Sequence, residues 1–208
     1  MSTPATHWNA YLIFGPPGCG KGTLCQFLKV ADSLYHLSTG DIFRSLDAHS
    51  PQGKLFHSYA DKGLLVPDEV TLGIWEDYVK ALIRKDFYKP EKQFLLLDGI
   101  PRTLHQAQSL DRYVQVKGVI VLEMPDIQAL VARLQNRAKL EGRKDDIDEK
   151  VIRERMRVYQ EQTLAILEHY PSSIVHRFNS QQTKLEVLRD VLAVLASELS
   201  MHPARAVL

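Results

Sequence analysis

The sequence predicts an α/β protein, built as a five-stranded parallel sheet with helices on both faces. Two observations carry this prediction. Apolar segments of strand length alternate with segments of helical period along the whole chain, and that alternation is typical of parallel strands joined by helices. A glycine-rich turn also stands between the first apolar segment and the first helical one, as at the ligand-binding edge of such sheets.

Each expected strand is a short apolar run bounded by polar or turn residues. We expect strands at residues 10–14, 35–38, 93–98, 118–123 and 174–178. Segments of helical period follow them, and we expect helices at residues 23–30, 68–83, 103–114, 126–137, 150–170 and 183–199. Prolines support several of these ends, because Pro67 and Pro125 stand just before an acidic first turn and Pro171 follows the longest helix.

Length and composition indicate a single soluble globular domain. The chain has 208 residues, of which 45% are hydrophobic and 25% charged, which is ample material for one core. We place this domain at residues 10–200, between loose tails at 1–9 and 201–208. The net charge of +1 argues against a broad basic surface for nucleic acid. The longest apolar runs are strand-sized, so we expect no membrane span, and we expect a cytoplasmic monomer.

The chain has two cysteines, Cys19 and Cys25, and both lie in or just after the glycine-rich turn. A disulfide there would distort the turn, and no histidine stands near either thiol in the sequence. We therefore expect reduced thiols, as in a cytoplasm, and no zinc site.

The glycine-rich turn predicts a phosphate-binding loop. Its nine residues are Gly15, Pro16, Pro17, Gly18, Cys19, Gly20, Lys21, Gly22 and Thr23. Glycines let the backbone curl around an anion so that N–H groups face it, and the following helix adds the positive end of its dipole. Lys21 supplies a full charge for the β- and γ-phosphates of a nucleotide. In the general pattern a hydroxyl residue follows the lysine directly, whereas here Gly22 intervenes and the hydroxyl is that of Thr23.

Two further motifs follow the second and third expected strands. Residues 38–44 read Ser-Thr-Gly-Asp-Ile-Phe-Arg, and residues 97–103 read Leu-Asp-Gly-Ile-Pro-Arg-Thr, with Gln106 three residues later. Together with the phosphate loop they place three motifs at the carboxyl ends of parallel strands, where open α/β sheets bind their ligands.

With these motifs the chain closely resembles the adenylate kinase family of nucleoside monophosphate kinases, over residues 10–199. The family loop is Gly-x-Pro-Gly-x-Gly-Lys-Gly-Thr, which accounts for Gly22 and Thr23. One departure is Ile100, where phenylalanine is usual. The resemblance implies a sheet of the P-loop NTPase type, a helical AMP-binding arm at about residues 40–70, and a short lid at about residues 138–146.

The resemblance also implies an AMP site. Arg44 and Arg102 correspond to the clamp on the AMP phosphate, and guanidinium groups suit phosphate oxygens. Thr39 faces the adenine, and the Gln106 amide can bond a purine edge. Relatives that prefer UMP or CMP commonly have alanine in place of Thr39, so this residue favours AMP. Further AMP-binding positions are Gly40, Leu64, Val66, Gly99, Arg143 and Arg155.

The lid side of the resemblance rests on a second group of arginines. Arg133 and Arg137 share one helix face, and Arg143 and Arg155 flank the short lid. The stretch before Arg155 is one residue longer than usual, so the functional arginine is either Arg155 or Arg153. The short lid has no cysteines to bind zinc. ATP binding is implied for the phosphate loop, for Arg133 and Arg137, and for Gln182 and Thr183 before the last helix.

The implied reaction transfers the γ-phosphoryl group of MgATP to AMP, giving two ADP. Asp98 and Thr23 are expected to hold the magnesium ion through bound water. No general base is needed, because the attacking phosphate oxygen is already anionic, and positioning with electrostatics carries such reactions. The expected catalytic residues are Lys21, Arg102, Arg137, Arg143 and Arg155.

Two alternatives stay open at this stage. One is a kinase that prefers UMP or CMP as acceptor. The other is a nucleotide-dependent switch or a non-catalytic binding module. The sequence has no Asn-Lys-x-Asp motif, and it has Pro101 where a GTPase switch would have glycine. The histidines show no metal-binding spacing, and His105, beside Arg102 and Gln106, is the one to test.

Overall fold

The computed structural model describes residues 7–201. It contains one parallel sheet of five strands in the order β2-β3-β1-β4-β5. The strands are β1 (Trp8–Phe14), β2 (Leu34–Ser38), β3 (Phe94–Asp98), β4 (Val114–Glu123) and β5 (Val175–Asn179). The predicted fold class is therefore confirmed.

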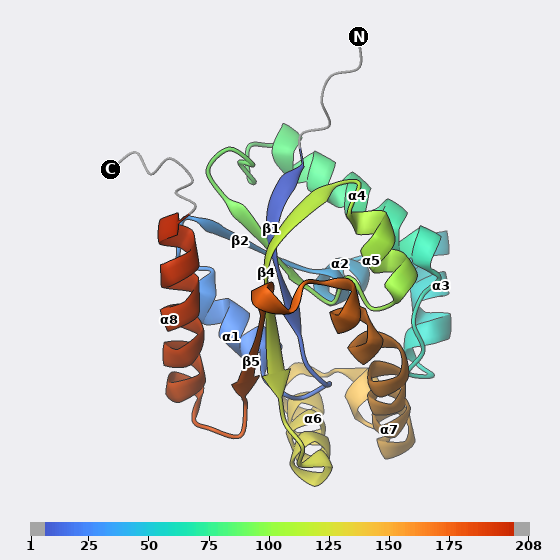
Figure 1. The fold of residues 1–208 in the computed structure, drawn as a ribbon. Helices are drawn as coiled ribbons and strands as arrows, with labels where there is room; N and C mark the ends of the chain where they lie inside the picture. The colour runs from blue at the N-terminus through green and yellow to red at the C-terminus, as the bar shows by residue number, and fades with distance from the viewer. Residues whose placement is uncertain (1–6, 202–208) are drawn as a thin grey trace.

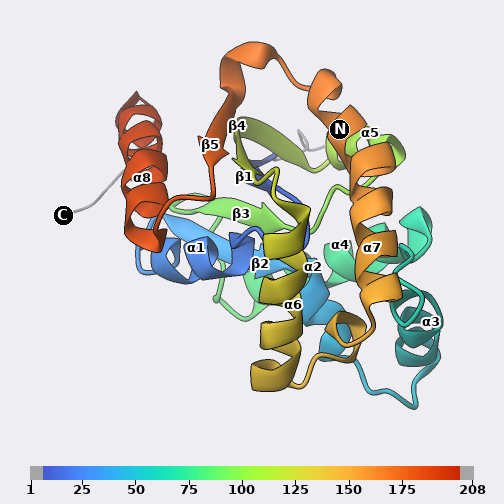
Figure 2. The same ribbon diagram turned by 90° about the horizontal axis from the view of Figure 1, so that it is seen from below.

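Helices connect the strands and cover both faces of the sheet (Figures 1 and 2). The α-helices are α1 (Lys21–Leu28), α2 (Thr39–Arg44), α3 (Pro51–Ala60), α4 (Asp68–Arg84), α5 (Leu104–Leu110), α6 (Ile127–Glu141), α7 (Glu149–Val158) and α8 (Lys184–Met201). Shorter helical turns are η1 (Lys144–Asp146), η2 (Tyr159–Thr163), η3 (Leu164–His169) and η4 (Ser172–Ile174). None of the described helices combines the length and the apolar character needed to cross a membrane.

Alternation along the central strand divides the core into two layers. Tyr11 and Ile13 of β1 point to one face, where they join residues of α1, α6 and α8. Ala10, Leu12 and Phe14 point to the other face, where they join residues of α4, α5 and η3. Because successive side chains of a strand point to opposite faces, a strand that is apolar throughout is buried on both sides.

The strand order places the phosphate loop at the centre of the ligand-binding edge. β1 lies between β3 and β4, and the chain first crosses to the β2 side and later returns to build the β4 side. In open α/β sheets the crevice at such a point takes the ligand. The loops that follow β1, β2 and β3 all begin at this edge.

Some predicted boundaries differ from the structure. The chain leaves α5 at Leu110 and β4 begins at Val114, so the predicted helix at 103–114 ends too late and the strand predicted at 118–123 starts too late. Valines at 114 and 116 favour the strand. The helix predicted at 150–170 is not one α-helix, because α7 ends at Val158 and η2, a π-helical turn, and η3, a 3-10 helix, follow.

The predicted inserts have counterparts in the structure, whereas most of the predicted tails lies outside the described residues. Trp8 and Asn9 already belong to β1, while residues 1–6 and 202–208 lie outside the described residues. The segment at 40–70 contains most of α2, all of α3 and the start of α4. The segment at 138–146 consists of the last turn of α6, which reaches Glu141, a Gly142–Arg143 turn, and η1.

Candidate active site

The phosphate loop turns sharply from β1 into α1. Gly20 precedes the first residue of α1 with φ 105°, a backbone conformation that favours glycine. Lys21 folds back over the loop, and its Nζ donates to the carbonyl oxygens of Gly15 at 2.6 Å and Pro16 at 3.2 Å. The lysine charge is thus held within the loop, on backbone oxygens that a phosphate group can replace.

One cavity of about 730 Å³ unites the predicted site. With the exceptions of Pro16 and Thr183, every residue predicted to bind ATP, AMP or magnesium lines it. The Thr183 hydroxyl instead bonds Glu186 in the first turn of α8, in the arrangement of a capping box. The motifs that follow β1, β2 and β3 therefore meet at one place, as their positions at strand ends predict.

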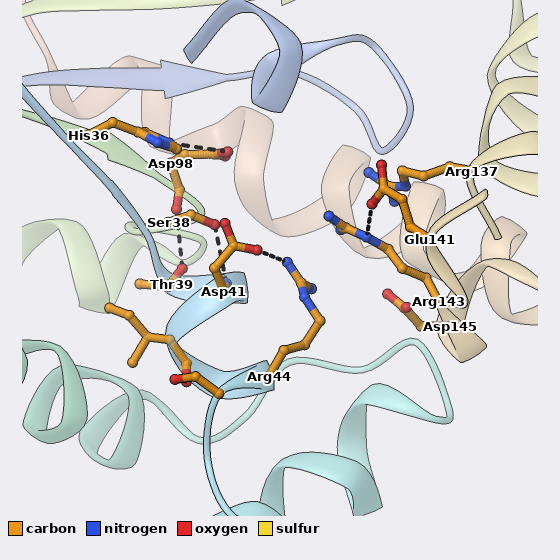
Figure 3. Close-up of polar contacts among 12 residues, drawn as sticks. His36, Ser38, Thr39, Asp41, Arg44, Asp98, Arg137, Glu141, Arg143 and Asp145 are labelled. Carbon is orange, nitrogen blue, oxygen red and sulfur yellow. Dashed lines mark hydrogen bonds and ion pairs between the residues drawn. The ribbon is translucent and has the colours of Figure 1, made fainter. Parts of the chain in front are cut away.

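The wall that follows β2 and β3 carries the predicted AMP residues. The Thr39 hydroxyl donates to the carbonyl oxygen of Asp98 at 3.3 Å (Figure 3). Gly99 has φ 86°, and a Cβ there would lie 2.6 Å from that hydroxyl. Arg102 Nε donates to the Gly99 carbonyl at 3.0 Å. Glycine is required between these groups because the backbone turns where Thr39 and Arg102 approach it.

Arg102 lies among other positive charges. Burial, together with the neighbouring charges of Arg155 and Arg44, lowers the pKa of Arg102 below its ordinary value. Arg44 itself pairs with Asp41 at 2.5 Å (Figure 3). An anion placed between Arg44, Arg102 and Arg155 would relieve this repulsion, so the wall is suited to bind a phosphate group.

Gln106 is 1% exposed, and both ends of its amide are occupied. Its Oε1 accepts from the Arg102 backbone N–H at 2.7 Å, and its Nε2 donates to Asp68 Oδ1 at 2.7 Å. Asp68 also accepts from the Thr103 hydroxyl at 2.7 Å and lies 3.3 Å from Nδ1 of His105. The sequence pattern marked Asp68 only as a helix start, and it did not indicate that this carboxylate orients Gln106.

The opposite wall carries the lid-side arginines, and a buried carboxylate holds two of them. Asp146 is 0% exposed, and its Oδ2 lies 2.6 Å from both Nε and Nη2 of Arg137. Its Oδ1 accepts from Arg155, which also pairs with Asp145 at 2.9 Å. Arg143 pairs with Glu141 at 2.6 Å (Figure 3). Asp146 was not among the predicted site residues, although it lies in the lid segment expected at about residues 138–146.

The structure distinguishes the two candidate arginines of α7. Arg155 lines the cavity and is bonded to Asp146, whereas Arg153 is exposed and pairs with Glu149 on the outer face of the helix.

Comparison with known proteins agrees with this geometry. A family model described as adenylate kinase matches residues 13–175. A Flavobacterium psychrophilum protein named adenylate kinase is 41% identical over 191 residues, covering 88% of this chain and 96% of that protein. The corresponding Synechococcus protein is 38% identical over 195 residues, covering 88% and 95%. The Thermus thermophilus protein is 36% identical over 194 residues, covering 90% and 97%. The chain belongs to the adenylate kinase family.

In this member of the adenylate kinase family, the donor-side residues lie on the α6 and α8 side of the cavity. Arg133 lines the cavity, and its Nη1 lies 3.2 Å from the sulfur of Met124. Gln182 donates to the Asn179 carbonyl at 3.2 Å, in the loop before α8. These contacts leave the Arg133 guanidinium without a carboxylate partner among the described residues.

The oxygen donors of this adenylate kinase family member suit a magnesium ion. Thr23 and Asp98 both line the cavity, from the start of α1 and the end of β3. Magnesium prefers oxygen ligands and keeps several of its waters, so one carboxylate and one hydroxyl acting through water are an adequate protein contribution.

The structure places a histidine beside one of the two thiols. His36 of β2 lies beside Cys25, and the ligand atoms of Cys25, His36 and Asp98 all lie within 4.8 Å of one another. Pairing of β2 with β3 brings the histidine there, which its sequence distance from the cysteines did not indicate. Burial raises the pKa of the Cys25 thiol. Burial also lowers the pKa of His36, while the charge of Asp98 opposes that change.

Proposed function

We propose that the chain catalyses the reversible transfer of the γ-phosphoryl group from MgATP to AMP, giving two ADP. The observation that carries this proposal is the single cavity, which holds a phosphate loop at its floor and arginines on two facing walls. A site for one nucleotide would need only the loop. The second wall supplies the positive charge needed to bring a second polyanion close to the first.

ATP would occupy the phosphate loop, with its β- and γ-phosphates at Lys21. The ammonium group of Lys21 would exchange the carbonyl oxygens of Gly15 and Pro16 for phosphate oxygens, which carry full charge and bind it more strongly. Arg133 and Gln182 would contact the donor nucleotide from the α6 and α8 side of the cavity. Thr183, which lies away from the cavity, would support only the start of α8.

AMP would bind at the wall that follows β2 and β3. Arg44 and Arg102 would clamp its phosphate, while Thr39 and Gln106 would face its adenine, near Leu64 and Val66. Asp68 fixes the Gln106 amide, because its carboxylate can accept only from the NH2 end and thereby directs the carbonyl end toward Arg102. The acceptor site is therefore organised before the nucleotide arrives.

Lys21, Arg102, Arg137, Arg143 and Arg155 would stabilise the charge on the transferring phosphoryl group. No general base is required, since the attacking AMP oxygen is anionic at neutral pH. The arm at 40–70 and the lid at 138–146 would close over the two nucleotides and exclude water, which would otherwise accept the phosphoryl group.

Magnesium would be held by Asp98 and Thr23 through bound water. When bound, the ion neutralises phosphate charge and orients the donor oxygens. The residues of the chain would meanwhile position the two nucleotides and keep water out. We also propose that the enzyme is a cytoplasmic monomer, and light scattering of the purified protein tests its monomeric state.

The decisive experiment measures nucleotide products with AMP, CMP, UMP and GMP as acceptors at a fixed MgATP concentration. We expect ADP to form fastest with AMP, and addition of EDTA to stop turnover. Inorganic phosphate in place of ADP would contradict the proposal, and so would absence of reaction with AMP. Faster turnover with CMP or UMP would favour the pyrimidine-specific alternative, for which the match to the adenylate kinase family gives no support.

A further inference from the structure

A thiol, an imidazole and a carboxylate meet at the edge of the cavity. Cys25 comes from α1, His36 from β2, and Asp98 from the end of β3. One ligand atom of each residue lies within 4.8 Å of the other two. Figure 3 shows the His36 ring and the Asp98 carboxylate pointing toward each other. The proposed phosphoryl transfer uses Asp98 and leaves Cys25 and His36 without a role.

The hydrogen bonding of this cluster is incomplete. His36 Nε2 is buried and has no hydrogen-bond partner, and it lies 4.0 Å from Oδ2 of Asp98. Buried polar atoms are almost always hydrogen-bonded, so a lone ring nitrogen facing a carboxylate needs an explanation. Cys25 is a free thiol with 0% exposure, and it makes no disulfide. The thiol, the imidazole and the carboxylate therefore each offer one metal-ligand atom within the same small space.

We propose that Cys25, His36 and Asp98 bind a divalent transition-metal ion of the zinc class, and that this ion inhibits the enzyme. Thiolate, imidazole and carboxylate are the three side-chain types that bind zinc. Magnesium would not compete for the sulfur and nitrogen ligands, because it prefers oxygen. Binding forms a metal–sulfur bond, breaks the S–H bond of Cys25, and releases the proton to solvent.

To bind one ion, the three ligand atoms must move only slightly closer together. With metal–ligand bonds of about 2.0–2.3 Å, ligand atoms around a tetrahedral ion lie roughly 3.3–3.6 Å apart. The present separations exceed this by no more than about 1.5 Å, which side-chain rotation can supply. His36 and Asp98 both line the central cavity, so the ion has a route of entry and its fourth position would face the nucleotides.

Inhibition follows from the part that Asp98 would play for magnesium. A zinc-class ion that holds the Asp98 carboxylate would withdraw it from the waters around magnesium. This second half of the inference rests on the proposed function, whereas the metal binding itself does not. The two halves therefore need separate experiments.

Binding is tested with Co²⁺ and tag-free protein, because a thiolate ligand gives cobalt a charge-transfer absorption band. The chain has two cysteines, which provide matched variants. We expect the band in the wild type and in Cys19→Ser, and its loss in Cys25→Ser. His36→Gln should weaken cobalt binding about tenfold or more, because even outer-shell changes at metal sites cost about 10–100-fold. A band that persists in Cys25→Ser, or no band in the wild type, would overturn the site.

Inhibition is tested by titrating Zn²⁺ at saturating MgATP and AMP. Cys25→Ser should keep its zinc-free activity and require at least about tenfold more zinc for half inhibition. Zinc that merely replaces magnesium on ATP would inhibit wild type and variant equally, and that result would overturn the inhibitory role. Cys25→Ala serves as a second variant, and thermal unfolding in EDTA verifies that both fold. Cobalt binding at Cys25 without zinc inhibition would uphold the site and contradict the role given to Asp98.

Discussion

The two walls of the cavity hold their arginines in different ways. On the lid side, Arg137 and Arg155 share the fully buried carboxylate of Asp146. On the acceptor side, Arg102 is fixed by the Gly99 carbonyl and makes no ion pair with a carboxylate among the described residues. Both walls present guanidinium groups to the same space, but Arg102 has no carboxylate partner among the described residues, whereas Arg137 and Arg155 share a buried one.

The difference follows from the backbone beneath each group. Arg102 lies four residues beyond the end of β3, and the central sheet fixes its position without help from a counter-ion. The lid arginines lie near the end of α6 and on α7, on either side of the short lid segment. A buried carboxylate ties these two elements together. Under the proposed function, the unpaired charge of Arg102 is available to the substrate, whereas Asp146 neutralises part of the charge of Arg137 and Arg155 and holds these two side chains in place.

If the uncompensated charge of Arg102 is the acceptor clamp, its removal should have the largest effect of any single change. Arg102→Ala should lower kcat/KM for AMP by about 10³–10⁵, the range for an arginine that stabilises the transferring phosphoryl group. Binding of MgATP, measured by calorimetry, should stay within about threefold, because the phosphate loop is unchanged. Unchanged turnover would remove the clamp role, and Arg153→Ala, an exposed arginine, is the control.

If Asp146 orders the lid wall, its neutralisation should affect stability and turnover together. Asp146→Asn leaves two arginines without their shared charge, so we expect a loss of about 3 kcal/mol and a Tm lower by about 6–12 °C. Misplaced arginines should also lower kcat by about 10²-fold. Asp145→Asn, which removes the more exposed partner of Arg155, is the matched control and should have a smaller effect on both.

Equal effects of Asp145→Asn and Asp146→Asn would contradict the distinction drawn between the buried and the exposed carboxylate. Thermal unfolding and kcat, measured on the same preparations, decide between these outcomes.

The fold and most of the site could be predicted because they depend on local patterns. A buried strand followed by a glycine-rich turn predicts the phosphate loop at residues 15–23. Because the strands are parallel, the residues that follow β1, β2 and β3 lie at one edge of the sheet. The arginines at 133 and 137 follow from helical spacing, since residues four apart share a face.

Other features depend on contacts between distant segments, which no local pattern encodes. Asp146 lies in the same acidic stretch as the solvent-exposed Asp148, and the packing of η1 against α6 and α7 buries it. His36 meets Cys25 because β2 pairs with β3, and Asp68 meets Gln106 across 38 residues. The end of α7 at Val158 could not be predicted either, because the sequence keeps a helical period through η2 and η3.

The acceptor wall can also be tested for its preference for AMP over CMP and UMP. Thr39 is buried, and its hydroxyl bonds the Asp98 carbonyl. If Thr39 bonds the adenine as proposed, Thr39→Ala should lower kcat/KM for AMP by about tenfold, since one such hydrogen bond contributes about 1–1.5 kcal/mol. Values for CMP and UMP should change by no more than about threefold, so the preference for AMP narrows. Ser58→Ala, which removes an exposed hydroxyl in the arm, should leave the preference unchanged.

A parallel loss with all acceptors would show that Thr39 supports the wall without reading the base. Competition experiments with AMP and CMP in one reaction measure the preference directly.

The smallest effect on AMP binding is expected from a change at Thr163, which connects the lid-side wall to the acceptor wall. Thr163, in the π-helical turn after α7, donates its hydroxyl to the Arg102 carbonyl at 3.1 Å, so the lid-side helix reaches the acceptor clamp through one hydrogen bond. Thr163→Val keeps the shape and removes the donor, which should cost about 1 kcal/mol and raise the KM for AMP about fivefold. The KM for ATP should not change if the bond serves the acceptor wall alone. Equal changes in the KM for AMP and the KM for ATP would contradict this expectation. They would mean that the hydrogen bond of Thr163 affects the binding of both nucleotides.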